Sequence, residues 1–274
     1  MNRQVVLATL LYNSNMHVIA AGATDIGKQR EHNEDAFCIV PDYHLYAVAD
    51  GMGGHSAGDV ASRMALYALQ SFFHLSARAE ATWPFHFDPH LSVEANRLIA
   101  GIRMANRRIF DASNQSREVH GMGTTIVTLH FSSNMQFAHI AHVGDSRCYR
   151  IREGEIVQLT RDHSLLNDFL DAIPGFSIEQ LEGLPKNVIT RALGIRDSVV
   201  VDLITDIPRE RDIYILCSDG LSGMVSDQEL LEICTTYSNQ PDKAVRKMIE
   251  QANNNGGEDN VTAVVLLVTA QSEI

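Results

Sequence analysis

The chain has 274 residues, enough for one large domain or two small ones, and its 45% hydrophobic and 20% charged residues are ordinary for a globular protein with a sizeable core. A formal net charge of −12 argues against nucleic acid as a partner, because phosphate backbones are bound by clustered Lys and Arg. No apolar run reaches the roughly 20 residues of a membrane-spanning helix, so we expect no membrane partner either.

The four cysteines are scattered and show no paired spacing. This pattern indicates reduced thiols in a cytoplasmic protein, with neither a disulfide framework nor a zinc site. Residues 5–12 are apolar, but they are few for the core of a secretory signal, and no long charged segment precedes them. We expect a first strand or a loose extension there. No coiled-coil pattern or apolar surface stripe stands out, so a monomer is the default expectation.

Residues 17–23 are predicted to form a strand, and a second strand follows at 36–40. The segment between them, residues 30–35, carries four charged groups and an asparagine ahead of the apolar run. A solvated edge turn would explain this composition. Alternatively, the segment supplies an arginine for an oxyanion and carboxylates for metal-bound waters.

The most informative stretch begins with an apolar run at 44–49, which we predict to be a short buried strand that ends at Asp50. Three glycines follow within four positions. A carboxylate delivered into a glycine-rich turn suits a hard cation, because glycine lets the backbone carbonyl approach the ion. An ordinary hairpin turn would have the same sequence. The pattern recurs at Asp219-Gly220 and at Asp259-Asn260, which favours a cation site built from three carboxylates.

Two long amphipathic helices are predicted next, over 57–73 with Ser56 as a cap and over 92–112, which indicates helices layered on a sheet. From residue 121 the pattern changes to short strands at 124–131, 137–142, 148–151 and 156–159, and again at 199–204, 212–217 and 260–269. Strands at such short intervals indicate antiparallel sheets. Helices are expected at 226–237, which opens with a capping box, and at 241–253.

A partly helical insertion at about 162–186 interrupts the strands and is predicted to be a flap. The sequence has no internal repeat and no linker. We therefore expect one domain over 1–274, with its core at about 17–269.

Six motifs along the chain have a familiar order. They are Arg30-x-x-Asn-Glu-Asp, Asp50-Gly-Met-Gly-Gly-His, Gly121-Met-Gly-Thr-Thr, Gly144-Asp-Ser-Arg, Ser218-Asp-Gly and Asp259-Asn-Val-Thr. This series resembles that of the metal-dependent protein phosphatases, the PPM or type 2C family, and is most similar to its bacterial members. The resemblance extends over about 22–268.

The resemblance implies an α+β fold in which two packed antiparallel β-sheets lie between layers of α-helices (α-β-β-α), with a flap insertion. It also implies hydrolysis of phosphoserine and phosphothreonine by a water or hydroxide that bridges two Mn²⁺ or Mg²⁺ ions. The expected partner is a phosphorylated protein, such as a serine/threonine kinase or its targets in bacterial signalling.

Two divalent ions provide a nucleophile at neutral pH and neutralise charge on the phosphate. On the family pattern, Asp50 is the candidate bridging ligand, with the Gly51 carbonyl on one ion and with Asp219 and Asp259 on the other. This oxygen-only donor set matches the preference of Mg²⁺ and Mn²⁺.

Three residues of the first motif are the catalytic candidates. Glu34 and Asp35 would orient metal-bound waters, and Arg30 would hold the phosphate through its planar guanidinium. We expect Asp145 and Arg147 of the Gly-Asp-Ser-Arg motif to be structural.

The chain departs from the family pattern at two places. Met52 stands where well-studied eukaryotic members carry a histidine proposed as the acid for the leaving group, so no general acid is assigned. Many bacterial members bind a third ion through an aspartate just before Gly-Met-Gly-Thr-Thr. Here the residue is Glu118, with Ser164 as a further candidate for that ion.

Two other functions compete with the phosphatase. A non-catalytic reader of phosphorylation would be expected to lack at least one of Asp50, Asp219 and Asp259, and all three are present. A nuclease or other phosphoryl hydrolase conflicts with the net charge of −12 and the absence of a basic stripe. The Gly-x-x-x-x-Gly-Lys-Ser/Thr loop of many NTPases is also absent.

Overall fold

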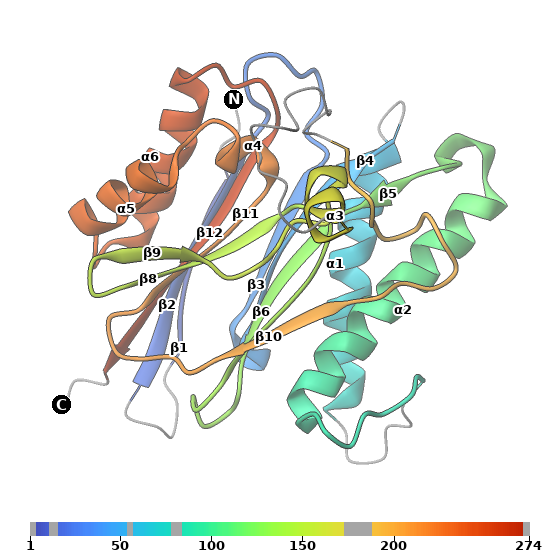
Figure 1. Ribbon diagram of the computed structural model, residues 1–274, viewed down its shortest axis with the longest axis horizontal. Helices are drawn as coiled ribbons and strands as arrows, with labels where there is room; N and C mark the ends of the chain where they lie inside the picture. The colour runs from blue at the N-terminus through green and yellow to red at the C-terminus, as the bar shows by residue number, and fades with distance from the viewer. Residues whose placement is uncertain (1–3, 11–15, 54–56, 78–83, 173–187, 271–274) are drawn as a thin grey trace.

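The computed structural model describes residues 4–10, 16–53, 57–77, 84–172 and 188–270. Two antiparallel sheets form its centre (Figure 1). In order across the first sheet, the strands are β1 (Gln4–Leu10), β2 (Met16–Asp25), β12 (Val261–Ala270), β11 (Ile213–Cys217), β8 (Arg147–Arg152) and β9 (Glu155–Gln158). In the second sheet they are β10 (Asp202–Asp206), β7 (Ala138–Val143), β6 (Ile126–Phe131), β4 (Leu45–Met52) and β3 (Asp35–Val40), and the short β5 (Gly123–Thr124) pairs with the end of β4.

Helices cover the outer face of each sheet. The second sheet packs against α1 (Ala57–Ser76) and α2 (Val93–Gln115), and the first packs against α5 (Asp227–Thr236) and α6 (Pro241–Asn254). Four shorter helices complete the described elements: η1 (Pro41–Tyr43), η2 (Arg117–Val119), α3 (Leu165–Ala172) and α4 (Asp219–Ser222). None of the helices in the described part of the chain is long and apolar enough to cross a membrane.

The apolar residues of β4 explain why the molecule has four layers. Alternate side chains of a strand point to opposite faces of its sheet. Leu45, Ala47 and Ala49 accordingly lie in the apolar layer beneath α1 and α2, while Tyr46 and Val48 lie in the layer between the two sheets. Because β4 is buried on both faces, its sequence is a continuous apolar run rather than an alternating one.

The α+β architecture with two packed antiparallel sheets between helices is confirmed, and the predicted capping box is present. Ser92 also caps α2, because its side chain accepts a hydrogen bond from the Ala95 backbone N–H at 3.0 Å. Ser226 and Glu229 form the reciprocal capping box that begins α5. The expectation of one domain over 1–274 stays a prediction.

Several predicted boundaries were wrong, and strand pairing explains two of them. Strand β4 does not end at Asp50 but continues to Met52, because β5 supplies a new partner for Gly51 and Met52. Strand β10 begins at Asp202 rather than at residue 199, because its pairing with β7 begins only there. The predicted Ser56 cap and residues 173–186 of the flap lie outside the described residues.

Candidate metal centre

The predicted acidic residues come from separate parts of the chain to one end of the two sheets. Asp35 begins β3 and is directly opposite Asp50 of β4 in the strand register. Asp219 begins α4, immediately after β11, and Asp259 lies two residues before β12. Because β11 pairs with β12, the segments that carry Asp219 and Asp259 leave the first sheet next to each other.

The backbone of Asp50 is fixed where β4 changes partner from β6 to β5. Its carbonyl accepts hydrogen bonds from the Thr125 N–H and from the Thr124 hydroxyl, both at 2.8 Å. Its own N–H donates to Thr125 Oγ1 at 3.2 Å. Hydrogen bonds at both its carbonyl and its N–H therefore hold the Asp50 backbone in place, and this fixes the position from which the side chain extends.

Glycine is required where α1 begins against β4. A Cβ on Gly51 would collide with the Gly58 carbonyl, and a Cβ on Gly58 would lie 2.8 Å from the Glu34 carboxyl. This close approach lets the Gly58 N–H donate to Glu34 Oε1 at 3.2 Å. The Glu34 carbonyl accepts from Ser62 Oγ at 2.6 Å and from the Gly51 N–H at 3.2 Å. Glu34 is thus held at both its backbone and its side chain.

The carboxyl groups of the cluster raise one another's pKa values. Burial, followed by the nearby charges of Asp35 and Asp219, raises the pKa of Asp50 well above its usual range. Burial raises the pKa of Asp35 to about 7, although the Ser218 hydroxyl donates to it at 2.7 Å. The pKa of Asp219 is raised by burial and then by Asp259, and that of Asp145 is raised to about 7 by burial and then by Asp219.

A cluster of this kind is unfavourable without a neutralising cation. Asp35 Oδ1 and Asp219 Oδ1 are buried and have no hydrogen-bond partner among the described residues. Unpaired buried carboxylate oxygens are the donors that hard divalent cations prefer.

Arg30 lies at the edge of the cluster. It donates to Asp259 Oδ2 at 2.6 Å, and its side chain is 52% exposed. Asn260 connects the two segments, because its Oδ1 accepts from the Glu34 N–H at 2.8 Å and its Nδ2 donates to the His32 carbonyl at 2.9 Å. The Arg30 guanidinium is therefore held by Asp259 on one side and exposed to solvent on the other.

A third ion held by Glu118 and Ser164 stays a prediction. Glu118 is exposed in η2 at the end of α2. Ser164 Oγ accepts from the Asn167 N–H at 3.3 Å and so caps the first turn of α3. In the described part of the chain, no hydrogen bond or ion pair joins either residue to Asp50, Asp219 or Asp259.

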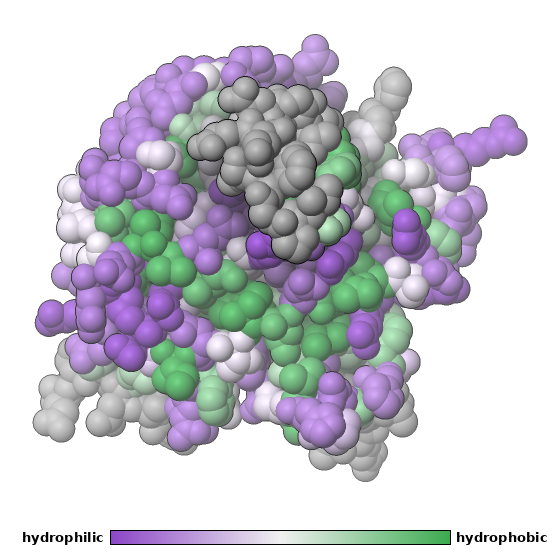
Figure 2. All heavy atoms as spheres, in the orientation of Figure 1, coloured by the Kyte–Doolittle hydropathy of each residue, from purple (hydrophilic) through white to green (hydrophobic). Residues whose placement is uncertain are grey.

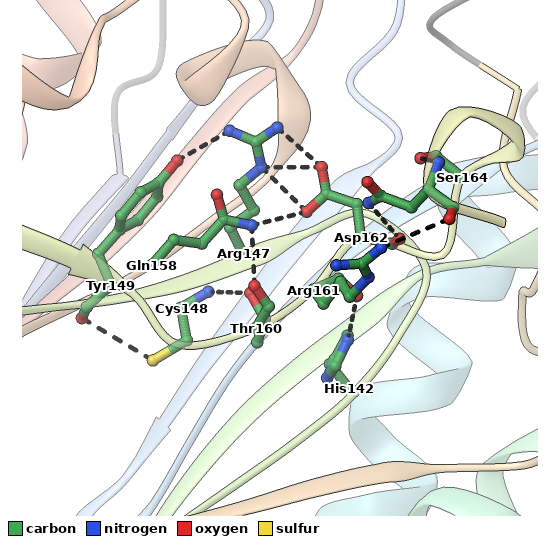
Figure 3. A network of polar contacts seen from close by, with 10 residues as sticks. His142, Arg147, Cys148, Tyr149, Gln158, Thr160, Arg161, Asp162 and Ser164 are labelled. Atoms are coloured by element: carbon green, nitrogen blue, oxygen red, sulfur yellow. Dashed lines mark hydrogen bonds and ion pairs between the residues drawn. The ribbon is translucent and has the colours of Figure 1, made fainter. Parts of the chain in front are cut away.

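The Gly-Asp-Ser-Arg motif has two roles. Arg147 binds both carboxylate oxygens of Asp162, at 2.7 and 3.0 Å, and donates to the Tyr149 hydroxyl at 2.9 Å (Figure 3). This part is structural, as expected. Asp145, however, lies close enough to Asp50 for its charge to contribute to the raised pKa of Asp50. Burial and then the charge of Asp219 raise the pKa of Asp145 itself. Its position after a buried strand and a glycine was the available signal, since the other cluster aspartates stand in similar turns.

A cavity of about 750 Å³ lies beside α3. Residues that line it include Arg103, Arg191, Arg196, Phe85 and Ile195. Ile195 approaches β5, because a Cβ on Gly123 would lie 2.8 Å from Ile195 Cδ1, and Gly123 is paired with Met52. The cavity is therefore one strand away from the end of β4. Figure 2 shows hydrophobic surface across the centre of the viewed face, and Ile195, Val200 and Ile207 are among the exposed apolar residues.

A four-layer fold that places buried carboxylates and an arginine at one end of its sheets defines a metal-dependent phosphatase as the class of protein. Residues 22–260 match the family model described as protein phosphatase 2C. The chain belongs to the protein phosphatase 2C family and is a protein phosphatase.

Individual relatives agree with this assignment. The serine/threonine phosphatase stp of Listeria monocytogenes serotype 4b is 37% identical over 253 residues, covering 89% of this chain and 93% of the relative. The crystal structure of the Mycobacterium tuberculosis serine/threonine phosphatase PstP/Ppp has a TM-score of 0.76 at 33% identity, covering 91% of this chain and 97% of that one. A structure of the PstP catalytic domain in complex with two manganese ions has a TM-score of 0.76 at 32% identity, with coverage of 93% and 99%.

Proposed function

We propose that this phosphatase hydrolyses phosphoserine and phosphothreonine in proteins and uses two Mn²⁺ or Mg²⁺ ions to do so. The observation that carries the proposal is the cluster of Asp35, which is buried, with the half-buried Asp50, Asp145 and Asp219, in which one buried oxygen of Asp35 and one of Asp219 have no hydrogen-bond partner among the described residues. When bound, the two ions supply a nucleophilic hydroxide at neutral pH and neutralise charge on the phosphate.

The ligands in this proposal are those that the motifs predict. Asp50, which is opposite Asp35 in the strand register and lies near Asp219, would serve both ions, and the Gly51 carbonyl would bind one of them. Asp219 and Asp259, which leave adjacent strands, would hold the second ion. Asp35 keeps one carboxylate oxygen free of protein partners, and Glu34 is fixed by Gly58, so both can accept hydrogen bonds from water at the site.

Arg30 would bind the phosphate of the substrate. Its guanidinium is anchored at Asp259 yet half-exposed, so one face is available for an incoming dianion. The cavity beside α3 has both arginine and apolar walls, which suits a peptide around the phosphorylated residue better than a bare phosphate. A phosphorylated serine/threonine kinase, or the targets of such a kinase in bacterial signalling, is the proposed class of substrate, with a cytoplasmic monomer as the acting form.

Replacement of Arg30 by Ala should raise the KM for a phosphate ester about tenfold or more and change kcat less, because a phosphate contact made before and during the reaction is lost. Arg30→Lys should recover little, since an ammonium cannot reproduce the two-pronged contact. Steady-state kinetics with p-nitrophenyl phosphate would measure both parameters. Arg63→Ala is the matched control, because Arg63 is 72% exposed and pairs with Asp59 on α1. A fall in kcat alone would contradict the assigned role.

The function is tested by following phosphate release from a phosphothreonine peptide and from p-nitrophenyl phosphate. The protein is assayed with Mn²⁺, with Mg²⁺, and after chelation by EDTA. Activity that disappears on chelation and returns with added Mn²⁺ is the expected result, and Asp219→Ala should not recover. Unchanged hydrolysis in excess EDTA would exclude the two-ion proposal, and a folded protein inactive with every metal would favour a reader of phosphorylation.

A further inference from the structure

His163 connects the turn that carries Asp145 to the cavity beside α3. Its side chain is 5% exposed. The Gly144 backbone N–H donates to His163 Nδ1, and the His163 N–H donates to the Gly144 carbonyl, both at 3.0 Å. On the other side, the Thr190 N–H donates to the His163 carbonyl at 2.8 Å. The backbone of His163 is thus hydrogen-bonded to Gly144 and to Thr190, and its ring is hydrogen-bonded to Gly144 as well.

These contacts fix the tautomer of the ring. A backbone N–H can only donate, so Nδ1 of His163 must be without a proton and the ring proton must lie on Nε2. Nε2 makes no hydrogen bond among the described residues, but it lies 3.3 Å from Asp202 Oδ2, and Asp202 Oδ1 accepts from Arg191 at 2.6 Å. A chain of polar contacts therefore runs from Gly144 through His163 and Asp202 to Arg191, which lines the cavity.

The neighbouring His142 supports the same ring orientation. The two rings are stacked, with centroids 4.6 Å apart and planes inclined by 17°. His142 Nε2 donates to the Arg161 carbonyl at 2.9 Å (Figure 3). Burial lowers the pKa of both histidines, so neither ring repels the other by carrying a charge.

His142, His163 and Asp202 also resemble a metal site, because each offers a ligand atom within 4.8 Å of the others. A metal ligand, however, needs a lone pair directed at the ion. Nδ1 of His163 is already an acceptor for Gly144, and Nε2 carries the proton. A metal ion on Nε2 would have to break the bond to Gly144 or bind an imidazolate, so the geometry favours a ring hydrogen-bonded to Gly144, with Nε2–H in electrostatic contact with Asp202.

The Gly144–Asp145 turn, to which His163 is hydrogen-bonded, also supports the metal centre. Gly144 has φ +107°, and a Cβ there would lie 2.6 Å from Thr125 Cβ, so the turn packs directly on Thr125. Thr125 Oγ1 accepts from the Asp50 N–H and is 2.6 Å from Ser146 Oγ. Asp145 lies between Gly144 and Ser146. A displacement of Gly144 would therefore reach both Asp50 and Asp145.

We propose that His163 is a positioning residue, whose Nδ1 lone pair holds the Gly144–Asp145 turn against Thr125 and whose Nε2–H connects that turn to Asp202 and Arg191 at the cavity. The consequence for catalysis rests on the proposed function, whereas the hydrogen-bond geometry does not. The two halves of the ring have separate roles: Nδ1 supports turnover, and Nε2 supports the wall of the cavity that would contact a peptide.

Two substitutions test the roles of the two ring nitrogens of His163 separately. In His163→Asn the amide oxygen takes the place of Nδ1 and keeps the bond to Gly144, but the side chain no longer reaches Asp202. In His163→Gln the amide nitrogen takes the place of Nε2 and reaches Asp202, but the acceptor for the buried Gly144 N–H is lost. His139→Gln is the matched control, because His139 is a buried histidine on the same strand as His142 and its contacts go to Ser92 and Thr205.

With p-nitrophenyl phosphate at saturating Mn²⁺, kcat should fall at least tenfold in His163→Gln and stay within about threefold of the wild type in His163→Asn. With a phosphothreonine peptide, His163→Asn should show a several-fold higher KM. The control should match the wild type in both assays. A loss of kcat of the same size in both variants, or wild-type kcat in a folded His163→Gln, would overturn the proposal.

A measurement on the wild type does not depend on activity or on the folding of a variant. Two-bond ¹H–¹⁵N correlations of histidine-labelled protein at pH 7 should show His163 as the Nε2–H tautomer. An Nδ1–H tautomer, a charged ring, or a shift of the His142 and His163 signals by one equivalent of Zn²⁺ would overturn it. If the wild type lacks Mn²⁺-dependent activity, the proposed function fails. The tautomer measurement still tests whether Nδ1 of His163 accepts the hydrogen bond from the Gly144 N–H.

Discussion

Asp50→Asn is expected to lower kcat for p-nitrophenyl phosphate by at least about a thousandfold, the order of effect found when a preorganised electrostatic group is removed. Asp50 is the carboxylate closest in register to Asp35 and is in contact with Asp219, so a neutral amide at this position weakens both ion sites together. The substitution is nearly isosteric, and the Asp50 backbone is held by Thr124 and Thr125. The fold should therefore be unchanged.

The matched control for this prediction is Asp42→Asn. Asp42 is exposed in η1, at the opposite end of the strand hairpin formed by β3 and β4, and the same chemical change there should leave kcat as it is. Isothermal titration with Mn²⁺ should show weaker binding in Asp50→Asn only. An Asp50→Asn protein that keeps most of its turnover would remove Asp50 from the metal site.

The same substitution should stabilise the metal-free protein. In the folded chain, burial and neighbouring carboxylates raise the pKa of Asp50, and the pKa values of Asp35 and Asp145 reach about 7. A carboxyl whose pKa is raised by folding binds more protons in the folded state. Between about pH 4 and pH 7 these carboxyl groups should therefore lower the free energy of unfolding of the metal-free wild type relative to that of Asp50→Asn, by an amount that grows as pH rises. At pH 7 Asp50→Asn should have the higher melting temperature.

Added metal should reverse the order of stability. At a Mn²⁺ concentration of 100 times Kd, the wild type should gain about 2.7 kcal/mol, whereas Asp50→Asn should gain much less. Thermal melts with EDTA and with Mn²⁺, across pH 4 to 7, would measure all four states. Asp42→Asn should follow the wild type throughout. A stability difference between the metal-free wild type and Asp50→Asn that does not grow as pH rises would contradict the repulsion between these carboxyl groups.

Local patterns in the sequence were sufficient to predict antiparallel strands with helices layered on them and the neighbourhood of the site, whereas the packing of two sheets between helices was implied by the family resemblance. Apolar runs bounded by turns predicted the strands, and motif residues at strand ends predicted which carboxylates would meet. The boundary at Asp50 was wrong, since the extension of β4 depends on β5, more than seventy residues away in sequence. Such pairing leaves no local signal in β4 itself.

Contacts between distant side chains were likewise beyond prediction from sequence. Asp145 belongs to a motif that also contains the structural Arg147, and only the packing of the turn on Thr125 separates their roles. The roles of Arg30, Glu34 and Asp35 stay predictions, as does a third ion at Glu118 and Ser164.

The order of strands in the first sheet has a consequence for synthesis of the protein. Strand β12 is the last strand of the chain, yet it lies between β2 and β11 in the middle of the sheet, and Asp259 leads directly into it. A growing chain that still lacks β12 has an open gap between β2 and β11. The catalytic centre can therefore form only after residues 261–270 have left the ribosome, so that shorter nascent chains cannot act as phosphatases.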